Sequence, residues 1–315
     1  LAFNFEKEAI RPNIFGKFED LLLNVVAHPA MLIYLDNINS TGPNSTIGKR
    51  KSVGLNENLA REILELHTLG VGGGYKQKDV IALAKLITGW TVSGGEFQFN
   101  PEMHEPTDVE FLGVVYKKDD NLRGIKALRY IAQHPSTAHF VSKKLVRHFC
   151  PGKEVPENAH KTIRAVLLNS KGDLQQIYQA IANLKEAWDT KRFRVKNNQD
   201  FIIALGKAVN IKPNIKSDYY FNSYKSLGEE PFNTTSPQGY LDDDNVIASG
   251  EIMKSRIEMA ILLAKNFSFN FKPADLAREI IGEMLSGKTK NAIFSARNDW
   301  QAYSFLLASP EFQKR

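Results

Sequence analysis

The stretch from residue 56 to residue 67 holds the densest set of polar side chains able to do chemistry in this 315-residue chain. On a helix of about 3.6 residues per turn, Glu57, Arg61 and Glu65 lie on one face, where opposite charges form ordinary surface ion pairs. Glu62 instead falls at the edge of the buried apolar face. A carboxylate there must be paired or hydrogen-bonded, or its pKa must shift. Glu62 is therefore a candidate catalytic carboxylate, with a buried structural hydrogen bond as the alternative.

His104 lies in a loop between two prolines and is the second candidate catalytic residue. An imidazole on an ordered loop can act as a general base or as a metal ligand, and the alternative is a solvent-exposed histidine without a role. If the loop folds back over Asn58 and Glu62, the three side chains line one polar pocket, with Asp36 and Asn56 close by as ligand-binding residues. The sequence identifies neither a metal nor an organic cofactor for such a pocket.

A stripe of basic residues marks a second candidate site. His139, Lys143 and Arg147 recur every fourth residue, so one face of a helix presents all three. Such a stripe can bind an anion or an anionic polymer, with Lys143 and Arg147 as ligand-binding residues. The alternative is a solvated helix face without a ligand.

Composition and missing motifs exclude several classes of protein. The net charge is +6, but 41 Lys and Arg against 35 Asp and Glu make a mixed surface, so no nucleic-acid partner is expected. Residues 242–245 lack the glycine and the terminal glutamate of a calcium loop, and the single cysteine, Cys150, has no base beside it. The longest apolar stretch, residues 21–35, is interrupted by polar residues and a proline, so no transmembrane span is expected.

Helical periodicity sets the expected fold class. We expect a mainly α fold: one irregular multi-helix domain over residues 1–315, with a small β-hairpin near residues 91–113 and a long irregular loop at residues 211–247. Ser136 is the expected N-cap of one of the helices. The segments with the apolar period of an amphipathic helix are residues 17–26, 56–69, 79–90, 122–133, 137–149, 158–168, 173–187, 198–209, 248–265, 274–286 and 296–308.

The motif GLNENLAREILELHTLGV at residues 54–71 closely resembles the signature of a bacterial domain-of-unknown-function family, DUF1800. The resemblance weakens in residues 211–247, where a Pro/Gly-rich family segment survives only as residues 237–240. Elsewhere it spans nearly the whole chain, in blocks at residues 28–32, 34–37, 73–75, 79–80, 88–90, 99–101, 104, 112–113, 134–138, 143–145, 172–174 and 309–312.

The resemblance implies an uncharacterised bacterial protein, because the family has no settled activity. Family members are typically longer at the N terminus and many are exported, which implies that an N-terminal part is absent here and that the location is periplasmic or extracellular. A sulfatase-like protein often accompanies the family, which implies a sulfatase-like partner.

Two hypotheses of function follow. The first is an exported protein whose polar pocket binds a metal or a small ligand, with a hydrolase-type enzyme as one form of it. The second is a non-catalytic helical binding or assembly module that works with a partner protein or an anionic polymer.

Overall fold

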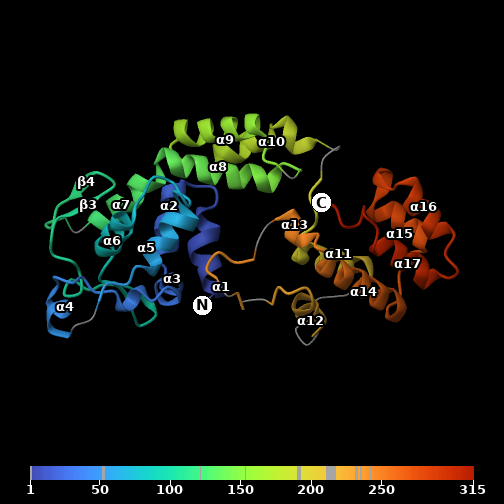
Figure 1. Cartoon of the computed structure of the whole chain (residues 1–315), viewed down its shortest axis with the longest axis horizontal. Helices are drawn as coiled ribbons and strands as arrows, with labels where there is room; N and C mark the ends of the chain where they lie inside the picture. The colour runs from blue at the N-terminus through green and yellow to red at the C-terminus, as the bar shows by residue number, and fades with distance from the viewer. Residues whose placement is uncertain are drawn as a thin grey trace. The chain divides into compact units, whose positions relative to one another are not determined.

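The chain is mainly α-helical, as the apolar periodicity predicts. The computed structural model describes residues 2–51, 54–120, 122–152, 154–189, 193–210, 218–230, 233–234, 236–240 and 243–315. The part of the chain that the structure describes is 59% helical, and its sheets are two small antiparallel hairpins (Figure 1).

The chain forms two compact units, Leu1–Asp189 and Thr190–Arg315, where the sequence led us to expect a single domain. The buried apolar residues explain the division. One cluster is drawn entirely from residues 201–312, whereas two others come from residues 22–132 and 138–184. Periodicity shows which face of a helix is apolar, but it does not show which other helix covers that face.

Short helices build the N-terminal unit. Helix α5 runs directly into a wider π-helical turn, Ile63–His67, so the regular helix of the polar segment ends at Glu62. The helices are α1 (Ala2–Phe5), α2 (Phe18–Ala27), α3 (Pro29–Tyr34), α4 (Thr46–Lys51), α5 (Asn58–Glu62), α6 (Gln77–Leu86), α7 (Arg123–Ala132), α8 (Pro135–Phe149), α9 (Glu157–Asn169) and α10 (Leu174–Ala182).

Two helices of this unit begin at a His-Pro pair. The Nδ1 atom of His28 accepts a hydrogen bond from the backbone N–H of Ala30 at 3.1 Å, at the start of α3. His134 accepts one from Ser136 at 3.1 Å, at the start of α8. His134, rather than the expected Ser136, therefore caps α8. In both cases the following proline takes the first helical position, where its missing N–H costs nothing.

Two tight hairpins lie between α6 and α7. In the first, β1 (Trp90–Ser93) pairs with β2 (Glu96–Phe99), and in the second, β3 (Val109–Phe111) pairs with β4 (Val114–Tyr116). Each turn has two residues with positive φ: 61° and 88° at residues 94 and 95, and 48° and 79° at residues 112 and 113. This geometry matches the right-handed twist of paired strands. The expected strand region near residues 91–113 is confirmed, although it holds two hairpins and extends to Tyr116.

The elements in the described part of the C-terminal unit are helices, apart from an isolated bridge between Val195 and Lys314. Residues 211–247, expected as an irregular loop, contain α12 and α13, while residues 211–217, 231–232, 235 and 241–242 lie outside the described ranges. The helices are α11 (Asn198–Ala208), α12 (Asp218–Ser226), α13 (Asp244–Ile247), α14 (Gly250–Asn266), α15 (Pro273–Ile280), α16 (Gly287–Phe294) and α17 (Asp299–Leu307).

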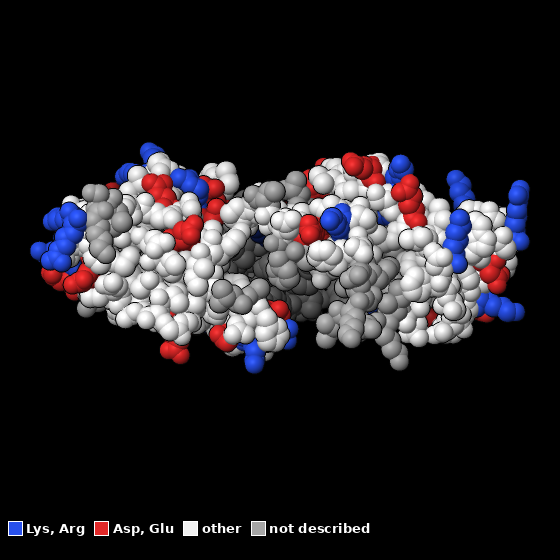
Figure 2. Space-filling view, turned by 90° about the horizontal axis from the view of Figure 1, so that it is seen from below, with Lys and Arg blue, Asp and Glu red and all other residues white. Residues whose placement is uncertain are grey.

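The surface carries charges of both signs. Figure 2 shows Lys and Arg side chains interspersed with Asp and Glu, and helix α4 carries several basic residues. Lys49 and Arg50 of that helix are exposed. No helix in the described part of the chain is long and apolar enough to cross a membrane.

Candidate functional site

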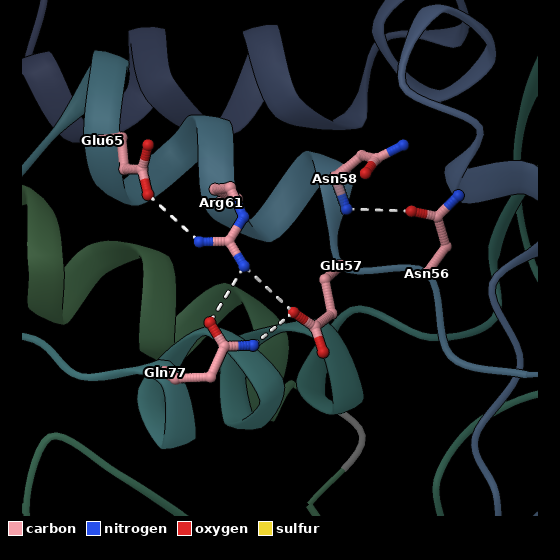
Figure 3. Close-up of polar contacts among 6 residues, drawn as sticks. All are labelled: Asn56, Glu57, Asn58, Arg61, Glu65 and Gln77. Carbon is pink, nitrogen blue, oxygen red and sulfur yellow. Dashed lines mark hydrogen bonds and ion pairs between the residues drawn. The ribbon is translucent and has the colours of Figure 1, made fainter.

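The polar segment begins with a local turn that brings together three of the predicted residues. The side-chain Oδ1 of Asn56 accepts a hydrogen bond from the backbone N–H of Asn58 at 2.9 Å, which orders the first turn of α5 (Figure 3). The Nδ2 group of Asn56 donates to the backbone oxygen of Asp36 at 3.3 Å. Asp36 itself is exposed and has a left-handed φ of 55°. The structure therefore gathers Asp36, Asn56 and Asn58 at the entry to α5, through contacts that shape the backbone.

Arg61 is the centre of a surface network that joins α5 to α6. Its guanidinium lies 3.2 Å from Glu57 and 3.2 Å from Glu65, one turn away on either side. It also donates to Gln77 at 2.9 Å, and Gln77 donates to Glu57 at 2.6 Å (Figure 3). The pairs between residues four apart are those that the sequence predicts. Each pair stabilises a helix by about 0.2–0.5 kcal/mol, so the network is explained by structure alone.

Glu62 stands apart from this network. In the described part of the chain its carboxylate makes no hydrogen bond and no ion pair. Burial raises the pKa of Glu62, the charge of Glu65 raises it further, and Arg61 acts in the opposite direction. Of the outcomes expected from its position, the surroundings of Glu62 therefore favour a shifted pKa. The predicted catalytic role is not tested by this geometry and stays a prediction.

His104 is held by hydrogen bonds at both ring nitrogens. Its Nδ1 lies 2.6 Å from the backbone oxygen of Thr88, so Nδ1 carries the proton and donates it to that oxygen. Its Nε2 lies 2.9 Å from Nε of Arg123, which donates to it. The ring is therefore neutral, in agreement with a pKa that burial and the charge of Arg123 lower, against the effects of Thr88 and Glu105. A histidine whose two nitrogens are both engaged is well suited to positioning other groups.

A buried polar cluster surrounds His104, and sequence reasoning missed it. Arg123 and Glu105 are both fully buried, at 0% exposure. Arg123 donates to the backbone oxygens of Thr107, at 2.6 Å, and of Glu105. The Glu105 carboxylate accepts from Asn44 at 2.7 Å and from the Thr107 hydroxyl at 2.7 Å. Burial acts to raise the pKa of Glu105, but these hydrogen bonds and the charge of Lys85 outweigh it, so the pKa is lowered.

Two glycines allow the cluster to close. A Cβ atom on Gly42 would lie 2.6 Å from Cα of Glu105, and one on Gly89 would lie 2.4 Å from the backbone oxygen of Asn100. Gly89 also has a positive φ of 79°. These two glycines are the sequence signal that could have predicted how closely the 99–105 loop packs against residues 42 and 89.

No contact among the described residues joins Glu62 to His104. Glu62 responds to charges on α5 and the following turn, whereas His104 responds to Arg123 and Glu105. The described residues also include no group of three or more His, Cys, Asp or Glu side chains that could hold a metal ion. The shared pocket proposed from the sequence stays a prediction without a supporting contact.

The predicted basic stripe lies on α8, which packs against α9. The rings of His139 and His160 meet edge to face, with centroids 4.7 Å apart, and Nε2 of His160 lies 3.1 Å from the backbone oxygen of His139. Burial lowers the pKa of His139, and the charges of His160, Arg164 and Lys143 lower it further, while Glu157 opposes them. Arg164 of α9 therefore joins the stripe, although the sequence does not reveal it.

Lys143 and Arg164 have few acidic neighbours in the part of the chain that the structure describes. Helix α8 contains no Asp or Glu, and in the described part of the chain Lys143 makes no ion pair. The Nε atom of Arg164 is buried and has no hydrogen-bond partner among the described residues. Lys144 instead lies over the Phe140 ring, 4.8 Å from its centroid. An anion placed at this surface would meet several cations and one nearby carboxylate.

A family model places the chain in a known class. The family described as "Protein of unknown function (DUF1800)" matches residues 1–314, so the chain belongs to it, and the resemblance seen in the sequence is confirmed. No curated protein and no solved structure matches the chain.

Proposed function

We propose that this chain is a non-catalytic helical binding module that holds an anionic polymer on the α8–α9 surface. The observation that carries the proposal is the meeting of His139, His160, Lys143 and Arg164 on two packed helices. Cations that are close together repel one another, so such a surface is favoured where an anion relieves the repulsion. Lys143 on α8 and Arg164 on α9 supply the lysine and arginine side chains of this surface.

The contacts of the other candidate residues favour this function over an enzyme. Both ring nitrogens of His104 are engaged, so the ring needs to break a hydrogen bond before it takes up a proton. Among the described residues the Glu62 carboxylate makes no hydrogen bond or ion pair, and its pKa is raised, which supports a small-ligand site at α5 as a second candidate. A location outside the cytoplasm and a sulfatase-like partner, both implied by the resemblance, are part of the proposal. They favour an anionic polysaccharide as the polymer.

Dextran sulfate, with uncharged dextran as the reference, tests the proposal. The chain should bind the sulfated polymer and not the neutral one, with an affinity that falls as salt rises. A Lys143→Gln/Arg164→Gln variant should bind roughly tenfold more weakly, since each exposed ion pair contributes up to about 1 kcal/mol. Isothermal titration calorimetry measures both effects.

A matched variant separates a defined site from general attraction. Arg129 and Lys272 are exposed, and an Arg129→Gln/Lys272→Gln variant removes the same net charge elsewhere. This variant should bind dextran sulfate almost as well as the unchanged protein. Equal losses in the two double variants would mean that binding follows net charge alone, and the α8–α9 assignment would then be wrong.

A further inference from the structure

A cavity of about 230 Å³ lies in the C-terminal unit, between α15, the short turn Gly282–Met284 and α16. Its lining is partly apolar and partly polar, and the apolar part includes Ala274, Ala277, Ile293 and Phe294. Ala277 and Ile293 belong to the buried core, at 1% and 5% exposure, whereas Phe294 is 65% exposed. The cavity therefore has a floor made by the core and an aromatic ring left open to solvent at its rim.

Three charged side chains also line the cavity: Arg278, Glu283 and Lys290. Arg278 lies 3.3 Å from Asp275, but both side chains are mostly exposed, at 76% and 54%, so this pair is weak. In the part of the chain that the structure describes, Lys290 and Glu283 make no ion pair. Among the described residues the rim thus offers Lys290, which makes no ion pair, and the weakly paired Arg278, with the carboxylate of Glu283 in the lining and that of Asp275 beside Arg278.

We propose that this cavity binds a small monocarboxylate with an apolar body, of the arylacetate class. An apolar cavity of about 150 Å³ accepts a benzene ring. A volume of about 230 Å³ therefore has room for a ring and a short carboxylate arm. The ring packs on Ile293 and Phe294 and covers apolar surface that is now exposed, while the carboxylate meets Lys290 and Arg278.

The charges select among ligands of this size. A neutral amide of the same shape keeps the apolar contacts and loses the attraction to Lys290 and Arg278. An amine of the same size is repelled by these two cations. A dicarboxylate brings a second charge toward Glu283, which disfavours it. The site is independent of the α8–α9 surface, since it lies in the other unit.

Phenylacetate and its neutral counterpart phenylacetamide are the probes for this site. Titration of the full chain, followed by amide NMR, should show saturable binding of phenylacetate with a dissociation constant of about a millimolar, as expected for so small a ligand. The shifts should fall on residues of α15 and α16. No saturable binding, or binding of phenylacetamide as strong as that of phenylacetate, would overturn the proposal.

Variants locate the binding and its charge. Lys290→Gln should weaken phenylacetate binding by roughly two- to fivefold and leave weak phenylacetamide binding unchanged. Lys288→Gln, an exposed position on the same helix that does not line the cavity, should change neither. Ala274→Met should fill the cavity and abolish both. If Lys288→Gln and Lys290→Gln weakened phenylacetate binding equally, the ligand carboxylate would not lie at Lys290 and the proposal would be wrong. This comparison remains valid even if the Ala274→Met protein fails to fold.

Discussion

Replacement of Arg123 by methionine should destabilise the N-terminal unit strongly, because this arginine is fully buried and serves three acceptors. The substitution removes the donors to His104 and to the backbone oxygens of Thr107 and Glu105. It also removes a positive charge that interacts with the Glu105 carboxylate. Methionine retains much of the aliphatic volume, so a cavity contributes little. A buried acceptor left without its donor costs about 1–3 kcal/mol, so the loss of three donated hydrogen bonds should lower the unfolding free energy by about 3–5 kcal/mol.

Urea unfolding followed by tryptophan fluorescence measures this loss. Trp90 is 6% exposed and packs beside Gly124, next to Arg123, so its emission reports on the affected region. The matched control is Arg129→Met, the same substitution at an exposed position of the same helix, which should change stability by less than about 0.5 kcal/mol. A loss below about 1 kcal/mol for Arg123→Met would refute the reasoning, since it would equal one ordinary hydrogen bond.

Three further predictions concern groups with shifted pKa values. At pH 6.5, the ordinary pKa of a histidine side chain, the His104 ring should be neutral, with its proton on Nδ1. The stability that the neutral ring contributes should be lost as the pH falls through the lowered pKa of the folded state. Imidazole NMR checks this, and a cationic ring at that pH would contradict it. Burial lowers the pKa of Lys196 from 10.5 to about 8. Between these two pH values the unfolded state binds more protons than the folded state, so the unfolding free energy should rise with pH over this range. Denaturation curves of the unchanged protein and of Lys196→Met measure this rise, which should reach about 3 kcal/mol at most. A difference in unfolding free energy between the two proteins that does not change with pH would contradict the prediction. Glu62→Gln should keep stability within about 0.5 kcal/mol in calorimetry and abolish ligand binding if α5 holds a site, whereas a larger loss of stability would reveal a structural role.

The helices were predictable because their apolar period depends only on neighbouring residues. Helix α8 was expected at residues 137–149 and runs over Pro135–Phe149. The error at its start has a physical cause: the imidazole Nδ1 of His134 accepts the capping hydrogen bond, although histidine is not among the usual N-cap residues. The division into two units was not predictable in this way, since it depends on which apolar faces meet over long separations.

The candidate site was predictable only in its local part. The Arg61 pairs follow from spacing along one helix, and the structure contains both. The π-helical turn at Ile63–His67 changes the angle between successive side chains, so a projection at constant pitch fails beyond Glu62. The pairing of His104 with Arg123 joins residues 19 positions apart across a hairpin. An arginine at the start of a helix is normally exposed, so nothing local marks it as a buried partner.

The motifs that carry the family resemblance have structural roles in this chain. Gly70 has a positive φ of 80°, its backbone N–H bonds to the oxygen of Leu64 at 2.9 Å, and a Cβ there would lie 2.4 Å from the Phe140 ring. Gly89 and His104 likewise close the loop cluster. His104 therefore has partners that explain it without any ligand, whereas the Glu62 carboxylate has none among the described residues. The α8–α9 cations differ, because packing brings them together without an equal number of acidic partners. A surface that the fold leaves electrostatically unbalanced is a better place to look for a ligand than a motif that the fold has already satisfied.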